Sequence, residues 1–448
     1  MTLSNIKIQE YLNSVCNQIK WKKSHVYIAN ELENHIIDQK NAFISQGLNE
    51  DKAIENAITE MGDPVGVGTN LDKIHKPKIE WSIIGLTFIA LLLGLVIQFF
   101  VTKDTSPTIG KGIIYSILGI SAMIVAYLTD YTVISKHPIK LFFGFLAIVL
   151  AIGIISPYYK GSYFYPKFIL LLYPTMFTGI IYSMRNNDYL GIVLCGVFMG
   201  ISYIALLSFA TYSTYVLYSL LSLILLTISI LKGWFNINKI KGMLLLYIPT
   251  IVVIIFMPIN NPYLRIRLMN AFNPAFDPNG AGYMSNLARE IISNAKFVGE
   301  GIGTSSGYMV PAIHTDFLLT YLIHSFGWIS FIIVVSVLAL LILKSFKLCL
   351  KQNSVLGSLV SLSVVLTISA EIIIYIAYNL GFQLIAPITL PLISYGGTGI
   401  IINMFLIGIM LSVFKWGNLV NDNVLLSKSN RFFSVNDGKI IIHFKPFS

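Results

Sequence analysis

The sequence predicts an all-α, polytopic membrane protein of about ten transmembrane helices, preceded by a small soluble helical domain. Of its 448 residues, 55% are hydrophobic and only 12% are charged, whereas soluble domains carry about 25% charged residues. Apolar runs long enough to cross a bilayer, about 17–25 residues, recur from Trp81 onward, and the mean hydropathy is +0.73. These observations exclude an ordinary soluble enzyme.

Residues 1–76 are expected to form the soluble domain, because this stretch is polar and charged. Ile28 to Gly47 has apolar residues at helical spacing and ends in glycine, which commonly terminates a helix. Asn49 suits the N-cap of a further helix, which Gly62 and Pro64 would close. We expect three or four short helices in water.

The same segment resembles the HAAS-like, or permease-prefix, domain found ahead of some Gram-positive membrane proteins. This resemblance implies a docking or regulatory role at most. A solvated helical cap without a specific partner stays open as the alternative.

A transmembrane domain is expected over 77–418, followed by a cytoplasmic tail over 419–448. The short connections on one side hold most of the lysines and arginines, which is the positive-inside pattern. Both termini of this plasma-membrane protein are therefore expected in the cytoplasm. The net charge of +10 is explained by this topology and does not indicate nucleic-acid binding. The expected spans are 81–101, 112–129, 140–157, 167–184, 189–209, 212–231, 242–257, 316–344, 355–381 and 389–415.

One external connection, 258–314, is far longer than the others. Loops of more than about 15 residues are usually functional or disordered, and this one contains aromatic residues, cations and a glycine series. Guanidinium groups match pyrophosphate oxygens bidentately, although lipid headgroups would attract them too. The GEGIG stretch would let backbone approach a ligand closely, although an ordinary flexible turn stays open. The candidates for binding a phosphate-bearing lipid are Arg265, Arg267, Arg289, Lys296, Gly299 and Gly301.

The long connection ends in the stretch IHTDF, where an apolar helix is expected to begin. A carboxylate at the mouth of a helix bundle is partly desolvated, which suits it to accept a proton near neutral pH. Asp316 is therefore a candidate general base, with His314 beside it. The alternative is that Thr315 or Asp316 caps the helix by accepting backbone N–H bonds.

A second group of candidates lies near the C-terminus, where Pro387, Pro391 and the pair Gly396-Gly397 interrupt an apolar run. Broken backbone at membrane depth is tolerated only where it is buried in protein or lines a cavity. The last two spans are therefore expected to border a cavity. Glu371 lies within the preceding span, where an unpaired charge is costly. It is expected to face the interior, to be protonated, or to pair with an arginine or tyrosine. A neutral group hydrogen-bonded within the bundle and a direct role in binding substrate both stay open.

Three stretches together resemble the shape, elongation, division and sporulation (SEDS) family, the FtsW/RodA/SpoVE group. The first is SYGGT preceded by Leu-Pro, and the second is PYLRIRLMNAFNPAFDPNGAGY. The third is GEGIG followed by VPAIHTDF, which resembles the family's Gly-x-Gly and Leu-Pro-Glu-x-His-Thr-Asp-Phe. Asp130-Tyr131 is a weaker match, and the likeness covers roughly residues 81–415.

The resemblance implies an enzyme, a peptidoglycan glycosyltransferase that polymerises lipid II on the outer face of the membrane with inversion at the donor sugar. It implies a class B penicillin-binding protein as partner. The family's catalytic carboxylate falls on Asp316, and Arg267 matches its arginine, which with Arg265 or a divalent cation would hold the pyrophosphate. Mg²⁺ or Mn²⁺ is the cation considered, with Asp316 as its candidate ligand. Thr315 and Ser394 are candidates for substrate contact because they belong to the matching blocks.

Several departures mark a divergent member. Ala312 stands where the family has glutamate, His324 to Gly327 replaces Glu-Glu-Leu-Gly, and Glu371 with Tyr375 aligns with Gln-x-x-x-Asn. A specialised or weakened enzyme therefore stays open. Two other functions also fit the sequence: a flippase for the lipid-linked precursor, and a silent scaffold that recruits the transpeptidase.

Overall fold

The computed structural model describes residues 3–20, 25–75, 79–101, 108–159, 162–209, 211–299, 312–416, 433–436 and 439–442. The chain divides into two compact units. One is built mainly on Met1–Ile79 and the other mainly on Glu80–Phe414. Each unit has its own buried core, so each is described by itself.

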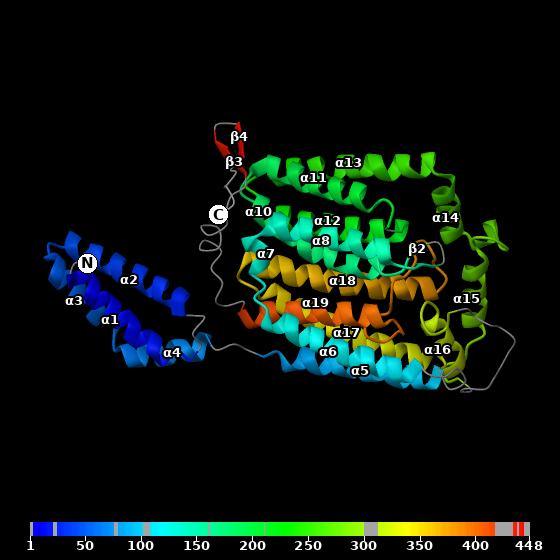
Figure 1. The fold of residues 1–448 in the computed structure, drawn as a ribbon, viewed down its shortest axis with the longest axis horizontal. Helices are drawn as coiled ribbons and strands as arrows, with labels where there is room; N and C mark the ends of the chain where they lie inside the picture. The colour runs from blue at the N-terminus through cyan, green and yellow to red at the C-terminus, as the bar shows by residue number, and fades with distance from the viewer. Residues whose placement is uncertain are drawn as a thin grey trace. The chain divides into compact units, whose positions relative to one another are not determined.

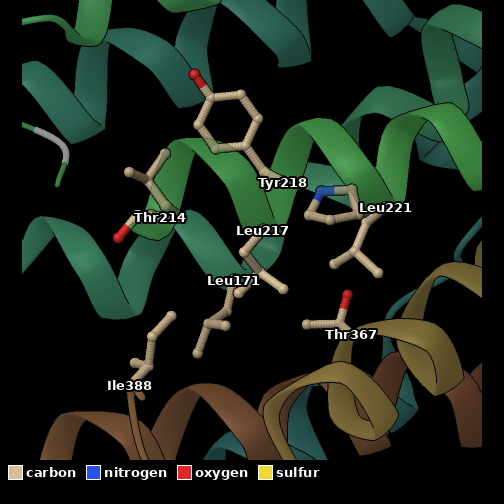
Figure 2. A pocket seen from close by; sticks show the side chains of 9 residues that line it. Leu171, Thr214, Leu217, Tyr218, Leu221, Thr367 and Ile388 are labelled. Atoms are coloured by element: carbon tan, nitrogen blue, oxygen red, sulfur yellow. The ribbon is translucent and has the colours of Figure 1, made fainter. Parts of the chain in front are cut away.

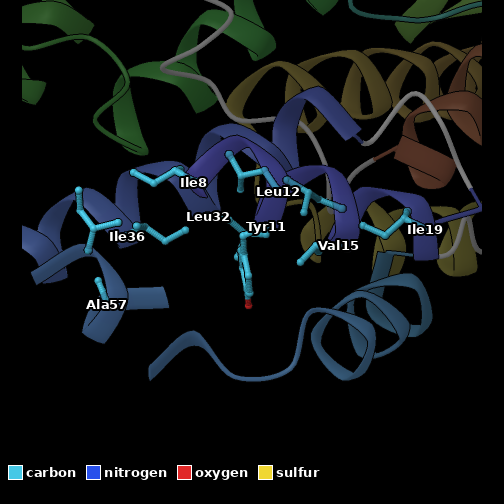
Figure 3. Packing of buried hydrophobic residues seen from close by; sticks show 10 residues of the cluster. Ile8, Tyr11, Leu12, Val15, Ile19, Leu32, Ile36 and Ala57 are labelled. Carbon is cyan, nitrogen blue, oxygen red and sulfur yellow. The ribbon is translucent and has the colours of Figure 1, made fainter. Parts of the chain in front are cut away.

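The first unit consists of four short helices, α1 (Leu3–Gln18), α2 (His25–Ser45), α3 (Glu50–Met61) and α4 (Pro64–His75). Their apolar faces meet in one core, in which Val15 of α1, Ile36 of α2 and Ala57 of α3 are fully buried. Figure 3 shows this packing. Asn49 is the N-cap residue of α3, although its side chain accepts no capping hydrogen bond, and Pro64 opens α4.

The second unit contains, among the described residues, ten helical segments that are long and apolar enough to cross a membrane, as the hydropathy predicts. The chain is therefore a multi-pass membrane protein. The fourth span joins α9 (Pro166–Ile169), a 3₁₀ turn (Leu170–Leu172) and α10 (Tyr173–Met184). The other spans are α5 (Trp81–Val101), α6 (Thr108–Leu128), α8 (Pro138–Ile155), α11 (Asp188–Leu206), α12 (Tyr212–Leu231), α13 (Lys239–Asn260), α17 (Trp328–Leu350), α18 (Val355–Asn379) and α19 (Gly397–Trp416).

The eighth span differs from the predicted range of 316–344. The chain forms a short helix, α16 (Leu318–Phe326), and the span proper is α17, which starts only at Trp328. Gly327 separates them with φ 82° and ψ 176°, a combination that essentially only glycine adopts. Apolar composition cannot show such a break, because both helices are hydrophobic.

The tenth span also begins later than the predicted residue 389. Residues 382–396 form turns and extended backbone between α18 and α19. Proline donates no backbone hydrogen bond, and Pro387 and Pro391 lie within this stretch. Leu392 adopts a positive φ of 66°. The stretch is called the broken segment below.

The long connection between α13 and α17 is ordered in its described part. It contains α14 (Pro262–Phe272), a 3₁₀ turn (Pro274–Phe276), α15 (Tyr283–Ser293) and α16. Asn261 caps α14 by accepting a hydrogen bond from the Leu264 amide. Figure 1 shows α14, α15 and α16 together at one end of the bundle, where the hairpin of β1 (Tyr158–Tyr159) and β2 (Ser162–Tyr163) also lies. The short helix α7 (Val133–Lys136) lies at the opposite end (Figure 1).

A second two-stranded hairpin, β3 (Phe433–Asn436) with β4 (Lys439–Ile442), follows the last span. The two small hairpins are the only strands among the described residues, so the predicted all-α membrane architecture is confirmed. Helix α18 lies at the centre of the second unit, since it packs against α10, α12, α16 and α17. Most of its length is buried.

We predict that Gly327→Ala destabilises the second unit. The dihedral angles require glycine, and an added Cβ would lie 2.5 Å from the Phe297 carbonyl oxygen and 2.6 Å from the Gly299 nitrogen. Backbone strain of this kind costs about 1–3 kcal/mol, so the melting temperature of the purified protein in detergent should fall.

Gly144→Ala is the matched control. Gly144 lies within α8, where an added Cβ meets nothing within 4 Å. Replacing a helical glycine by alanine is favourable by about 1 kcal/mol. Equal melting temperatures for the Gly327→Ala and Gly144→Ala proteins would contradict the assigned break.

Candidate active site

The predicted base, Asp316, lies in a turn directly before α16. The carbonyl of Ala312 closes this turn by accepting hydrogen bonds from the amides of Thr315, Asp316 and Phe317, at 3.0, 3.0 and 3.2 Å. Ala312 itself has φ 56°, a left-handed conformation that costs a residue with a Cβ about 1–2 kcal/mol. Such strain is held in place by surrounding contacts and clusters at functional sites.

The helix-cap alternative is not what the structure shows. The N-cap residue of α16 is Phe317, whose side chain forms no capping hydrogen bond. The Thr315 hydroxyl donates to the Ala312 carbonyl at 3.5 Å. The Asp316 carboxylate forms no hydrogen bond or ion pair with any residue in the described part of the chain. Its side chain is partly exposed.

Two side chains of α18 hold the backbone of this turn. The Tyr375 hydroxyl donates to the Thr315 carbonyl and accepts from the Leu318 amide at 3.2 Å. The Asn379 amide group donates to the Asp316 carbonyl at 3.0 Å, and its oxygen accepts from the Thr320 amide at 3.0 Å. Both backbone groups of Asp316 are therefore engaged, while its carboxylate is left available.

Two of the three sequence stretches that carry the family resemblance meet at this turn. The Tyr395 amide donates to the His314 carbonyl at 3.0 Å, which joins the broken segment to the turn of Asp316. The neighbouring Ser394 hydroxyl is buried, accepts from the Leu390 amide and donates to the Leu390 carbonyl. Its hydrogen bonds are thus formed within the turn rather than toward a ligand.

His314 is half-buried, and its Nδ1 is buried without a hydrogen-bond partner among the described residues. Burial lowers the pKa of His314 below its ordinary value, because desolvation disfavours the charged imidazolium. The side chain is therefore neutral at pH 7. A neutral imidazole beside the turn can donate or accept one hydrogen bond to a sugar or phosphate group.

Arg267 of α14 is a predicted cation whose charge, like that of Asp316, acts on Tyr378 of α18. The charges of Arg267 and Asp316 both act on the hydroxyl of Tyr378, whose ring packs against Phe317 with centroids 5.2 Å apart. Arg267 also donates to the Tyr263 hydroxyl at 3.3 Å and to the Ser213 hydroxyl at 3.4 Å. The charges of a carboxylate and a guanidinium group therefore both reach one tyrosine.

The other predicted cations are not equivalent. Arg289 of α15 donates to the Gly381 carbonyl at 3.3 Å and stacks on Phe382, 5.1 Å from the ring centroid, so it joins α15 to the turn after α18. Arg265 is exposed on α14. Lys296 has an exposed side chain, and its carbonyl accepts from the Trp328 amide at 3.2 Å.

The two predicted glycines have different outcomes. Gly299 packs against the junction between α16 and α17, where an added Cβ would lie 2.6 Å from the Gly327 nitrogen. This close approach explains the glycine without a ligand. Gly301 lies outside the described residues.

Glu371 lies inside the bundle, with 2% of its surface exposed. One carboxylate oxygen accepts from the Asn403 amide at 3.0 Å and from the Thr389 hydroxyl at 3.5 Å. The other oxygen is buried without a partner among the described residues, as is the amide oxygen of Asn403. The predicted interior orientation agrees with this geometry, and the side chain does not reach the surface where a substrate would arrive.

A pocket in the bundle is bordered by the ninth span but by no residue of the tenth, so it is not the cavity expected between these two spans. Figure 2 shows Thr214, Leu217 and Tyr218 of α12 lining it, together with Thr367 of α18 and Ile388 of the broken segment. None of the predicted site residues lines this pocket. It is therefore separate from the turn of Asp316.

The sequence did not single out Tyr375, Tyr378 and Asn379 as site residues. A signal was present, because Glu371, Tyr375 and Asn379 are polar groups four residues apart in an otherwise apolar helix, and side chains at this spacing share one helix face. Their partners are backbone groups distant in sequence, which periodicity cannot identify.

The comparisons with known proteins show the family to which the chain belongs. The model of the FtsW/RodA/SpoVE family, described as cell cycle protein, matches residues 78–417. This match covers most of the chain and all ten spans. The chain belongs to the FtsW/RodA/SpoVE family. Its membership of the SEDS group is thereby confirmed.

Two curated relatives are named probable peptidoglycan glycosyltransferase FtsW. That of Thiomicrospira cyclica is 29% identical over 171 residues, which cover 37% of this chain and 44% of the relative, less than half its length. That of Geobacter metallireducens is 26% identical over 313 residues, which cover 67% of this chain and 83% of the relative.

A solved structure has the same fold as this chain. It is a chain from a peptidoglycan synthase complex that coordinates polymerisation and crosslinking. The TM-score is 0.60 at 16% identity, and the match covers 75% of this chain and 97% of that chain. The prefix unit α1–α4 precedes the family match.

We predict that His314 makes the stability of this protein sensitive to acid. Its pKa is lowered in the folded state, so the unfolded chain binds the proton first. Above the unfolded pKa of about 6.5 both states are neutral, and stability is lost as pH falls below this value toward the folded pKa. The His314→Gln protein should therefore lose less melting temperature than the wild type between about pH 7.5 and pH 5.

The exposed His35 of the first unit provides the control. His35→Gln should follow the wild type over the same pH range, because this side chain lies on the surface. Parallel acid sensitivity of the wild type and His314→Gln would show that another group is responsible.

Proposed function

We propose that this protein is a peptidoglycan glycosyltransferase that polymerises lipid II into glycan strands on the outer face of the cytoplasmic membrane. One observation supports this most directly. Both backbone groups of Asp316 are fixed by Ala312 and Asn379, while its carboxylate forms no bond to a described residue. A fixed backbone with an available carboxylate suits a general base.

The reaction needs a base and a means of stabilising the leaving group. The acceptor sugar hydroxyl attacks the anomeric carbon of the donor, the bond from that carbon to the pyrophosphate oxygen breaks, and the configuration inverts. Asp316 takes the hydroxyl proton as the new glycosidic bond forms. Arg267 neutralises charge that develops on the leaving pyrophosphate, since a guanidinium group pairs bidentately with phosphate oxygens.

A divalent cation is compatible with these residues, but the described residues provide no complete set of protein ligands for it. The described residues contain no cluster of three or more histidine, cysteine, aspartate or glutamate side chains. Mg²⁺ is usually held by one or two carboxylates together with substrate phosphates. Asp316 would be its protein ligand, and the cation would supply neutralisation of pyrophosphate charge.

The partner proposed is a class B penicillin-binding protein. The support is the similarity to a chain of a synthase complex that couples polymerisation with crosslinking. In the proposed orientation both termini lie in the cytoplasm, so that the end of the bundle with α14, α15 and α16 (Figure 1) faces outward, where the lipid-linked sugar is exposed. This orientation rests on the positive-inside pattern.

We predict that Asp316→Asn abolishes polymerisation. The substitution keeps the shape of the side chain and removes the base, which normally contributes a factor of about 10²–10⁴. The measurement is the length distribution and rate of glycan formation by the purified protein on lipid II, with its partner added, with and without Mg²⁺ or a chelator.

Asp188→Asn is the matched control, because Asp188 is an exposed carboxylate at the start of α11 and belongs to none of the groups assigned to the site. Its φ of 45° also suits asparagine. Equal polymerisation by the wild type and Asp316→Asn would refute the proposed base. Lipid II transport without polymerisation would favour a flippase, and partner recruitment as the sole retained function would favour a scaffold.

We also predict that deleting residues 1–76 leaves the rate of polymerisation within about twofold of the full chain. The first unit has its own core, and every residue assigned to the reaction lies in the second. The same lipid II assay on the truncated protein tests this. A large loss of activity in a truncation that keeps its melting temperature would show that the first unit takes part in the reaction.

A further inference from the structure

A stripe of polar side chains runs along α18 beneath the proposed reaction site. Glu371, Tyr375 and Asn379 follow one another at intervals of four residues, so they lie on one face of the helix. Their exposed fractions are 2%, 0% and 0%. We call these three residues the polar stripe.

The upper two members hold the turn of Asp316. Tyr375 and Asn379 bind the carbonyls of Thr315 and Asp316, and Asn379 also binds the amide of Thr320. The Thr320 hydroxyl donates back to the Asn379 carbonyl at 3.0 Å. These contacts join the turn and the first residues of α16 to α18.

The third member holds the broken segment. Glu371 accepts hydrogen bonds from Thr389 of this segment and from Asn403 of α19. The broken segment in turn binds the turn of Asp316, because the Tyr395 amide donates to the His314 carbonyl. Helix α18 thus holds the turn of Asp316 in two ways. Asn379 binds it directly, and Glu371 binds Thr389 of the broken segment, which holds the turn through the hydrogen bond between Tyr395 and His314.

The surroundings of Glu371 exclude a direct encounter with substrate. Its side chain is almost fully buried, and no ion pair is formed by Glu371 within the described part of the chain. Both described donors to Glu371, an amide and a hydroxyl, are uncharged. The carboxyl group of Glu371 therefore acts by accepting hydrogen bonds from its neighbours, and it presents no charge to a ligand.

We propose that Glu371 is a positioning residue for the glycosyl transfer, acting through the broken segment to hold the turn of Asp316. The inference rests on the proposed function only for its catalytic consequence. The structural consequence, a looser turn when Glu371 loses its hydrogen bonds, is independent of which reaction the site performs.

The test compares Glu371→Gln with Glu371→Leu. Glutamine keeps an oxygen that accepts from Asn403 and Thr389, whereas leucine leaves both buried donors unpaired. Leucine should raise amide hydrogen exchange across 312–320 about tenfold and lower kcat for lipid II polymerisation about 10- to 100-fold. KM for lipid II should change less than about twofold, because ground-state binding is not touched. Glutamine should restore both exchange and kcat to within about threefold of the wild type.

Thr389→Val provides a second variant in case leucine prevents folding. It removes one donor to Glu371 at nearly constant volume, and should change exchange and kcat in the same direction by a smaller factor. Thr367→Val is the matched control. Thr367 lies four residues before Glu371 on the same face of α18, but its hydroxyl donates to the Ser363 carbonyl of its own helix and to no other described residue. Exchange across 312–320 should therefore stay at the wild-type level.

Equal losses of kcat in Glu371→Gln and Glu371→Leu would overturn the proposal, because the charge itself would then be needed. Unchanged exchange across 312–320 in Glu371→Leu would overturn it as well. Absence of polymerisation in the wild type would instead refute the proposed function, and the exchange measurement would still decide whether Glu371 positions the turn.

Discussion

The constraint on which this structure depends is that backbone groups buried in a membrane protein must find partners inside the protein. The turn before α16 and the broken segment after α18 are both non-helical, so neither has the regular backbone hydrogen bonds of a helix. Side chains of α18 supply further partners for the turn, and Ser213 of α12 and Gln98 of α5 do so for the broken segment. Tyr375 and Asn379 bind backbone groups between Thr315 and Thr320, and the two irregular segments bind each other through Tyr395 and His314. A central, largely buried helix thereby makes irregular backbone possible where the site requires it.

Much of the fold follows from composition alone. Ten spans and a separate polar helical unit are visible in the sequence, because the hydrocarbon thickness of the bilayer fixes helix length and the prefix is charged. The breaks are less visible. Gly327, Pro387 and Pro391 indicate interruptions, but the residues of α16 and of the broken segment are as apolar as the spans beside them. The ends of the eighth and tenth spans were therefore predicted wrongly, although the spans themselves were predicted correctly.

The site was predictable to the extent that it rests on local chemistry. Asp316 and Arg267 were identified by residue type and resemblance, and the charges of both reach Tyr378. Arg289 has the same chemistry as Arg267, yet its guanidinium group holds a turn. Ser394 belongs to the most recognisable block, yet its hydroxyl is used within that block. Tertiary contacts decide which of several chemically equivalent side chains stays available for a substrate. These contacts cannot be read from a single sequence.

The contrast between the two carboxyl groups shows how burial assigns different tasks to the same chemistry. Asp316 is partly exposed, its backbone is held at both ends, and its carboxylate has no bond to a described residue. Glu371 is almost fully buried and accepts bonds from two neutral donors. A group that must exchange protons with a sugar hydroxyl has to reach both the substrate and water, so only the first can be a base. A group that must hold two segments together is better shielded from water, since a hydrogen bond is stronger where the local dielectric is low. The distance in sequence between these carboxyl groups hides their connection, which runs through the backbone of the turn and not through their side chains.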